Sequence, residues 1–500
     1  MSKSQDQPVP GGAGPEAGSG PPRLAPEQLH RSVLFVLWAW AFGAFWLQTV
    51  TGASLTRFAQ QMGLSPFGFG LMAAISFMAA LVQPISALFI ERHGRRKGLF
   101  LATALPHRLL WLAIAGIPWL LPQRWWTHAF LWLVGLAALG AYASSPAWLS
   151  WMSDLIPRSI RGRFMSRRVQ LGNVVTLLLC LAIGLSLDWA GRRGDRATMA
   201  IAGMWLAAAA VMGTADILMH APVPDPGPTR RPGPRLGVRL LLKPLADRNF
   251  RFFLLYIGTL TFATAYIGAY IWLFAFDVLG MSNLKANILL TVAPLAVSIF
   301  LYRPWGRVMD RIGYRPVMLI GGGFIIIGPS LWPFVSGPFW WVPYIVVLAI
   351  MVGWAAIEVA NTNFLMALSE SRRHPGAEGV AYPVLYGLVV ATSGIASGLA
   401  AGAIAAWLGK DWQRTLFGFK ITYHAVLLFL SSALRLLAVL CLIPIREPKA
   451  LGTRQALRYV TEHTFANLHH AFLLPVRWFG RAAQYSYKIG PQARPTRPNR

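Results

Sequence analysis

Long apolar runs alternate along this chain with short polar or basic segments. The first run spans about Ser32 to Arg57, the last spans about Ile421 to Ile445, and ten more lie between them. A helix of roughly 20 residues crosses the hydrocarbon core of a bilayer, so each run is long enough for one crossing. The pattern predicts an all-α membrane protein with twelve transmembrane helices.

The longest internal interruption of this pattern covers residues 221–251, where Pro, Gly and Arg dominate. We interpret it as a cytoplasmic linker between an N-terminal six-helix half, residues 32–220, and a C-terminal half, residues 252–447. Residues 1–31 are rich in Gly and Pro and predict a disordered tail. Residues 448–500 mix bases with apolar side chains, which predicts an amphipathic cytoplasmic tail on the membrane surface.

Composition supports the membrane class, because 55% of the residues are hydrophobic and only 13% are charged. The net charge of +28 would suggest a nucleic-acid partner in a soluble protein. Here, however, Lys and Arg concentrate in alternate loops and in both tails, as the positive-inside rule requires of cytoplasmic segments. We therefore expect a multi-pass protein of the cytoplasmic membrane, with both termini inside, anionic lipid headgroups as partners and no nucleic acid.

The sequence shows no enzyme motif. It has no phosphate-binding loop, no His-Glu-x-x-His and no nucleophile elbow. Its two cysteines, Cys180 and Cys441, lie in separate apolar runs and form neither a disulfide framework nor a metal-binding spacing. We expect a protein that is not an enzyme and that has no cofactor and no metal.

A short charged motif occurs twice, each time where an apolar run ends, and the copies lie nearly half the chain apart. The first basic motif (residues 87–97) contains Glu91, Arg92, Gly94 and Arg95, and the second basic motif (residues 306–315) contains Gly306, Asp310, Arg311, Gly313 and Arg315. Gly94 and Gly313 suit a tight turn, because glycine tolerates positive φ.

Both copies resemble the signature between helices 2 and 3, and between helices 8 and 9, of major facilitator superfamily (MFS) transporters. Ala87 and Glu91 replace the Gly and Asp of that signature in the first copy. The resemblance covers about residues 32–447 and implies two pseudo-symmetric six-helix bundles. The loop from Trp151 to Arg168 is similar to poorly characterised bacterial members of the family.

The resemblance also implies that both motifs act as a conformational latch, which holds the cytoplasmic side shut while the other side is open. Asp154 matches the position of the acid that pairs with a base of the first motif. The simpler alternative is that the bases only orient the chain in the membrane, but this leaves the acids and glycines unexplained.

Glu358 is the one carboxylate that lies well inside a predicted span, in a helix that lines the cavity of the family. Charge at membrane depth is costly and usually functional. Removal from water favours the neutral form of a carboxyl group, so Glu358 is a candidate for proton coupling or substrate binding, with Asn361 and Asn363 one turn further on. A structural ion pair is the alternative.

Polar side chains in two other predicted spans are further candidates. Tyr256, Thr259, Tyr266 and Tyr270 lie on one face of span seven, and Gln48 and Thr51 lie in span one. Such groups suit a neutral or amphipathic solute, although membrane helices also use them to bond to one another.

Three basic side chains within apolar runs are assigned to packing. Arg108 and Arg435 are expected to snorkel or to play a structural role, with substrate contact as the alternative. His107 is expected to pack with a hydrogen bond, with a proton relay as the alternative. Gly394, Gly398 and Gly402 repeat at every fourth position of span eleven, which allows another helix to approach closely. The resemblance implies that this partner is helix 2.

We expect a secondary, proton-linked or facilitative, carrier of a small organic solute that works by alternating access. The alternative is a non-transporting member of the fold that acts as an assembly factor, scaffold or sensor, with a protein partner at its basic C-terminal tail.

Overall fold

The computed structural model describes residues 25–227, 242–335, 341–370, 378–416, 419–447, 450–451, 455–456 and 458–459. Twelve spans within these residues are long and apolar enough to cross a membrane, which confirms the prediction. Residues 1–24 of the predicted N-terminal tail and nearly all of residues 448–500 lie outside the described residues, as does the middle of the predicted linker. The predicted tail extends to residue 31, but the first helix already begins at Pro26, because Pro at the start of a helix is compatible with its geometry.

The N-terminal half contains six spans, two of which are interrupted. Gly52 adopts an extended conformation and divides the first span. Ser65 caps the second, accepting a hydrogen bond from the backbone N–H of Gly68 at 3.1 Å, with Pro66 in the first turn. The helices are α1 (Pro26–Thr51), α2 (Ala53–Gln61), α3 (Pro66–Ala80), α4 (Gln83–His93), α5 (Arg96–Leu120), α6 (Trp126–Leu155), α7 (Arg158–Gly191) and α8 (Asp195–His220).

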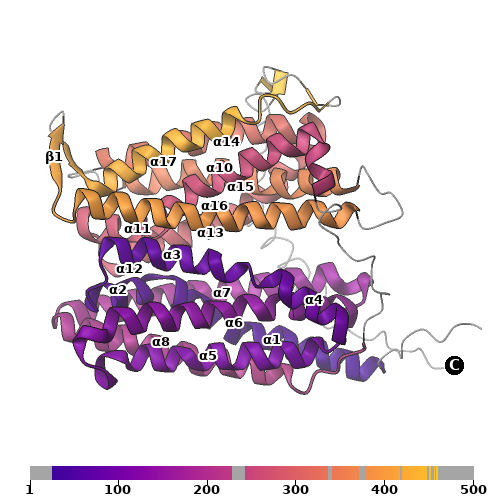
Figure 1. The fold of residues 1–500 in the computed structure, drawn as a ribbon, viewed down its shortest axis with the longest axis horizontal. Coiled ribbons are helices and arrows are strands. Elements are labelled where there is room, and N and C mark those ends of the chain that lie inside the picture. Colours follow the sequence, from indigo (N-terminus) through magenta and orange to yellow (C-terminus); the bar gives the residue numbers. More distant parts are fainter. Residues whose placement is uncertain are drawn as a thin grey trace, which may run out of the picture.

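The C-terminal half repeats this arrangement, and Figure 1 shows the two halves side by side. Short π-helical stretches at Phe274–Val278 and Ile288–Val292 interrupt its first two spans. The helices are α10 (Arg248–Gly268), α11 (Tyr270–Leu273), α12 (Asn283–Asn287), α13 (Ala293–Ile312), α14 (Tyr314–Leu331), α15 (Val342–Glu370), α16 (Glu378–Leu408) and α17 (Tyr423–Leu440).

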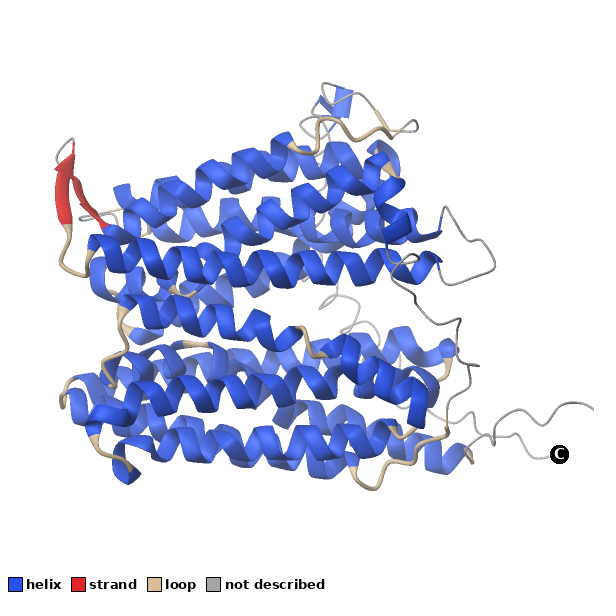
Figure 2. Cartoon of the chain, in the orientation of Figure 1, coloured by secondary structure: helices blue, strands red, loops and turns tan. Residues whose placement is uncertain are grey.

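A small antiparallel hairpin of β1 (Gln413–Leu416) and β2 (Phe419–Thr422) connects α16 to α17 and stands at one end of the helices (Figure 2). We call this the hairpin end. The opposite end carries both basic motifs, and we call it the motif end.

The apolar core differs between the two ends. At the hairpin end one cluster joins both halves, with Phe58 and Phe69 from the first half and Tyr270 and Phe274 from the second. Toward the motif end the core divides into two clusters. One, around Trp151, belongs to the N-terminal half, and the other belongs to the C-terminal half. The halves are thus packed together at the hairpin end and have separate cores at the motif end.

Candidate functional site

The first basic motif forms a turn that is tied to its own half. Gly94 ends α4 with φ +65°, which confirms the expected use of glycine. Arg96 is 1% exposed and forms ion pairs with Asp154 and with Asp225, the latter at 2.8 Å. The base that pairs with Asp154 is therefore Arg96. The predicted bases, Arg92 and Arg95, are exposed, as is Glu91.

The second basic motif is tied in a related way. Glu447, which follows α17, accepts hydrogen bonds from the backbone N–H groups of Tyr314 at 3.1 Å and Arg315 at 2.9 Å. The Arg315 guanidinium donates to the carbonyl oxygens of Leu442 at 3.2 Å and Ile443 at 2.9 Å. In each half, the turn after the second span is thus bonded to the chain that follows the sixth span.

The remaining predicted residues of the second motif have different surroundings. Gly313 has φ +95°, as its position in a turn requires. Arg311 donates to the Tyr459 hydroxyl at 2.5 Å and is exposed, as is Asp310. Gly306 is half-buried, with open space where a side chain would begin. The bonds that both motifs make in this structure lie within one half, not across the two.

Polar contacts between the halves gather at the hairpin end. Asp188 of α7 accepts hydrogen bonds from the backbone N–H groups of Asn283 at 2.6 Å and Leu284 at 3.1 Å. Arg57 donates to the Asn283 side chain at 2.7 Å. Gln60 donates to Asp277 at 3.1 Å. These bonds join α2 and α7 of one half to the first two spans of the other.

A glycine seam joins α3 to α16 across the interface, where the two helices run side by side (Figure 1). A Cβ atom on Gly398 would lie 2.6 Å from the carbonyl oxygen of Gly70, and one on Gly402 would lie 3.1 Å from that of Phe67. A Cβ on Gly394 would lie 2.3 Å from the Phe77 ring. The expected close approach of span eleven to span two is confirmed.

The aromatic stripe of span seven is largely buried. Tyr256 and Tyr266 are 0% and 1% exposed. Tyr270 is buried in the core shared by both halves, and its hydroxyl donates to the carbonyl oxygen of Pro66 at 2.8 Å. Thr259 is half-buried. In this arrangement the stripe packs within the protein and against the other half, so its tyrosines do not line an open space.

The two candidates of span one, Gln48 and Thr51, form hydrogen bonds away from the tyrosine stripe of span seven. Gln48 is buried and donates to the Cys180 sulfur at 3.2 Å. Thr51 is exposed and donates to the carbonyl oxygen of Leu47 in its own helix at 2.7 Å. The structure therefore does not bring either side chain together with the tyrosines of span seven.

Glu358 accepts a hydrogen bond from the Tyr302 hydroxyl at 2.6 Å, which connects α15 to α13. Val347, Met351, Trp354 and Glu358 follow one another at helical steps, so they share a face of α15. Val347 and Met351 pack in the core that joins the halves, yet Glu358 itself is exposed. Glu358 thus lies on the same face of α15 as two residues of that core, further toward the motif end.

The two asparagines near Glu358 differ from each other. Asn361 is 9% exposed, and its side chain interacts with the buried Tyr256 hydroxyl. Asn363 donates to the carbonyl oxygen of Val359 in its own helix at 2.8 Å. Asn361 thus contributes a buried acceptor to the C-terminal half, whereas the amide group of Asn363 bonds to its own helix.

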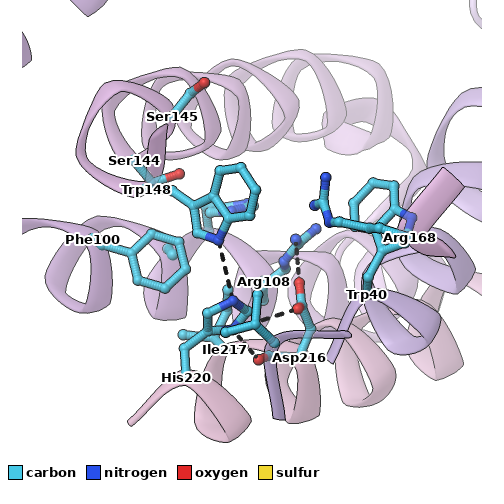
Figure 3. A pocket seen from close by; sticks show the side chains of 13 residues that line it. Trp40, Phe100, Arg108, Ser144, Ser145, Trp148, Arg168, Asp216, Ile217 and His220 are labelled. Carbon is cyan, nitrogen blue, oxygen red and sulfur yellow. Dashed lines mark hydrogen bonds and ion pairs between the residues drawn. The ribbon is translucent and has the colours of Figure 1, made fainter. Parts of the chain in front are cut away.

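The structure also contains a buried charge cluster that the sequence analysis missed (Figure 3). Arg108 of α5 donates to the Asp216 carboxylate of α8 at 3.0 Å, and its guanidinium lies 3.5 Å from the centre of the Trp46 ring. Arg108 is 7% exposed and Asp216 is 5% exposed. Of the two roles predicted for Arg108, the structural one describes the observed buried pair, and snorkelling does not.

Arg168 completes the charge cluster. Its guanidinium lies 3.8 Å from the centre of the Trp40 ring and 4.4 Å from that of Trp148. The Trp148 ring N–H donates to Nε2 of His220 at 3.1 Å, and Nδ1 of His220 lies 2.8 Å from the Asp216 carbonyl oxygen. Together with α1, α5 and α6 side chains, these groups line a cavity of about 150 Å³.

Glycines make room for this cluster. A Cβ on Gly43 would lie 2.8 Å from the Asp216 carboxylate, one on Gly172 would lie 2.6 Å from the Trp40 ring, and one on Gly213 would lie 2.7 Å from Arg108. The signal that could have found the pair is the presence of opposite charges, Arg108 and Asp216, in two apolar runs.

The other two basic residues assigned to packing are also buried. Arg435 donates to the carbonyl oxygen of Ile325 at 3.0 Å and is 6% exposed, which supports the structural alternative over snorkelling. His107 packs edge-on against Trp46, with ring centres 5.4 Å apart, but its Nδ1 has no hydrogen-bond partner among the described residues.

Comparisons with known proteins agree with this architecture. The sequence profile of the Major Facilitator Superfamily matches residues 37–389. A mutant of the nucleoside transporter NupG has a TM-score of 0.63 and 13% identity, covering 84% of this chain and 100% of that one. No curated protein matches the sequence significantly.

Two further solved structures show the same fold. A bacterial homologue of the human lysosomal transporter Spinster, in an inward-facing and occupied conformation, has a TM-score of 0.61 and 13% identity, covering 84% of this chain and 97% of that one. A D-xylose–proton symporter has a TM-score of 0.58 and 14% identity, covering 84% of this chain and 99% of that one. The chain therefore belongs to the Major Facilitator Superfamily and has the twelve-helix fold of its transporters.

Proposed function

We propose that this protein carries a small organic solute across the cytoplasmic membrane by alternating access, with protons as the coupling ion. The observation that carries the proposal is the division of the core, which is continuous at the hairpin end and split at the motif end. Two rigid bundles that share one interface can rock between two arrangements.

The orientation follows from charge. The motif end carries the loops in which Lys and Arg concentrate, so it faces the cytoplasm. The arrangement described here is then inward-facing, with the hairpin end closed toward the outside. The anionic headgroups of the inner leaflet are the expected neighbours of the basic loops.

Glu358 is the proposed coupling residue. Its bond with Tyr302 joins α13 and α15. The ionised carboxylate accepts this bond, and protonation removes its charge, so the packing of the two helices can respond to a proton. Asn361 and Tyr256 place an interacting pair of polar groups in the adjoining core, where they can respond to the same change.

The two basic motifs are proposed to close the motif end in the opposite state. In the present arrangement Glu91, Arg92, Asp310 and Arg311 are exposed. Their exposed side chains can form contacts across the interface when the bundles rock, with Arg311 exchanging its present bond to Tyr459. Arg96 and Arg315 keep each turn attached to its own half during that motion.

The test is transport by the purified full-length protein in liposomes, with a panel of radiolabelled solutes and an imposed pH gradient. Accumulation that depends on the gradient supports proton coupling, and counterflow without accumulation supports a facilitative carrier. If every solute class fails, the alternative of a non-transporting scaffold is favoured, and the tail after residue 448 is then tested for a protein partner.

A further inference from the structure

We propose that the cavity beside Arg108 and Arg168 binds the carboxylate group of a small organic anion. The cavity lies within the N-terminal half, because its walls come from α1, α5, α6, α7 and α8. Binding at this site is separate from the proposed movement of solute between the two halves.

The first argument is the charge around the cavity. Two guanidinium groups, of Arg108 and Arg168, share one carboxylate, that of Asp216. A Trp ring N–H can only donate, so Nε2 of His220 accepts from Trp148 and Nδ1 carries the proton. His220 is then neutral, and Nδ1 donates to the Asp216 carbonyl oxygen. The cavity wall therefore has an excess of one positive charge at a depth where charge is costly.

The second argument is the unused hydrogen-bonding capacity of the two guanidinium groups. Nε and Nη1 of Arg108 are buried and have no partner among the described residues, and neither has Nε of Arg168. The Arg108 side chain is more than nine-tenths buried, so these N–H groups cannot simply turn to bulk water. Buried donors that lack a partner are costly, and an anion in the cavity would satisfy them.

The third argument is the shape of the cavity. Its walls include Trp40, Trp148 and Phe100, which suit an apolar or aromatic body. Of the polar side chains on the wall, Ser145 is exposed and Arg168 is half-buried, whereas Ser144, Arg108 and Asp216 are buried. The volume of about 150 Å³ restricts the ligand to a small molecule.

The chemistry favours a carboxylate over a neutral group. A guanidinium presents parallel N–H donors that match the two oxygens of a carboxylate. The Arg168 guanidinium contacts the Trp40 and Trp148 rings, and these contacts restrict the orientation of its donors. The charge of the ligand would balance the second cation, while Asp216 continues to balance the first.

Binding is tested by isothermal titration of the purified full-length protein with benzoate, with its neutral isostere benzamide and with inorganic phosphate. We expect benzoate to bind and benzamide not to bind. Arg168→Gln should weaken benzoate binding roughly ten- to a hundredfold, in line with the loss of a charged hydrogen-bond donor. Arg168→Lys keeps the charge but loses the parallel N–H donors of the guanidinium. Its affinity for benzoate should lie between that of Arg168→Gln and that of the unmodified protein.

The matched control is Arg167→Gln, which removes an exposed guanidinium one residue away on the same helix and should leave binding unchanged. Equal loss in both variants would overturn the assignment of the site. Binding of phosphate without benzoate would overturn the carboxylate assignment. If liposomes transport another solute while no anion binds, the inference fails and the transport function stands.

Discussion

Asp188 caps α12 of the opposite half, because its carboxylate accepts a hydrogen bond from the backbone N–H of Asn283 at 2.6 Å. The carboxylate thus meets the positive end of the α12 dipole, at the place where the two bundles are packed together. This contact stabilises the arrangement that is closed at the hairpin end.

We expect Asp188→Ala to shift the protein toward the state that is open at the hairpin end. Hydrogen bonds to a charged group contribute about 1.5–3 kcal/mol each, so the ratio of the two states should change at least tenfold. Spin labels on both halves of the hairpin end would report longer distances. Asp195→Ala is the control, because Asp195 bonds to Gln61 in the same half. Unchanged distances in Asp188→Ala would contradict the role given to this contact.

The glycine seam gives a second prediction. Gly398→Val adds atoms where Gly70 already lies 2.6 Å from the Cβ position, so the hairpin end should close poorly and transport should fall at least tenfold. Gly387→Val, on the same helix with open space around it, should transport normally. Flux into liposomes, at matched amounts of folded protein, compares the two. Equal transport by both variants would mean that close packing of α3 against α16 is not needed for transport.

The buried Arg108–Asp216 pair allows a double-mutant test. Asp216→Leu leaves a buried guanidinium without its carboxylate and should destabilise the protein by about 3–5 kcal/mol. Replacing both members, Arg108→Met with Asp216→Leu, should recover much of this loss. Unfolding in detergent measures all three variants against the unmodified protein. A double variant that is less stable than Asp216→Leu alone would show that the pair contributes more than its own charges.

Glu358→Gln removes the proposed proton site but retains an acceptor for the Tyr302 hydroxyl. We expect uphill, gradient-driven transport to be lost while exchange of solute across the membrane continues. Liposome assays with and without a pH gradient separate the two activities. A Glu358→Gln protein that still concentrates its solute would exclude Glu358 as the coupling site.

The basic motifs can be tested at their exposed members. Arg92→Ala and Asp310→Asn should slow cycling severalfold without reducing membrane insertion, because neither side chain is buried. Normal transport by both variants would remove the latch from the mechanism. Arg96→Ala should instead lower stability, since it leaves Asp154 and Asp225 without their shared guanidinium.

The twelve spans and the close packing of span eleven could be predicted because their signals are local. Hydropathy depends on a window of about 20 residues. Glycines at every fourth position, such as Gly394, Gly398 and Gly402, identify a face of one helix without reference to its partner. The turns at Gly94 and Gly313 were equally local, since each depends on the φ of one residue.

The polar contacts could not be predicted because they depend on how each helix is rotated about its axis. Arg95 and Arg96 are adjacent in sequence, yet only Arg96 turns toward Asp154. Arg108 and Asp216 are 108 positions apart, and their contact requires the helices to meet at one depth. The tyrosines of span seven could be assigned to one helical face, but the sequence did not indicate whether that face lines a cavity or packs against other helices. In the structure these tyrosines are buried by packing.

The bonds that Asp225 and Glu447 make have a consequence for chain connectivity. Asp225 binds Arg96, and Glu447 binds the start of α14, so each bundle fastens the chain beyond its own last span to an early turn. Neither bond involves residues 228–241, which join the bundles covalently. A protein cleaved in that segment keeps both fastenings and every contact of the hairpin end. Two fragments, each containing one half, should therefore assemble when they are made separately. The covalent connection would then serve to supply the two halves in equal amounts.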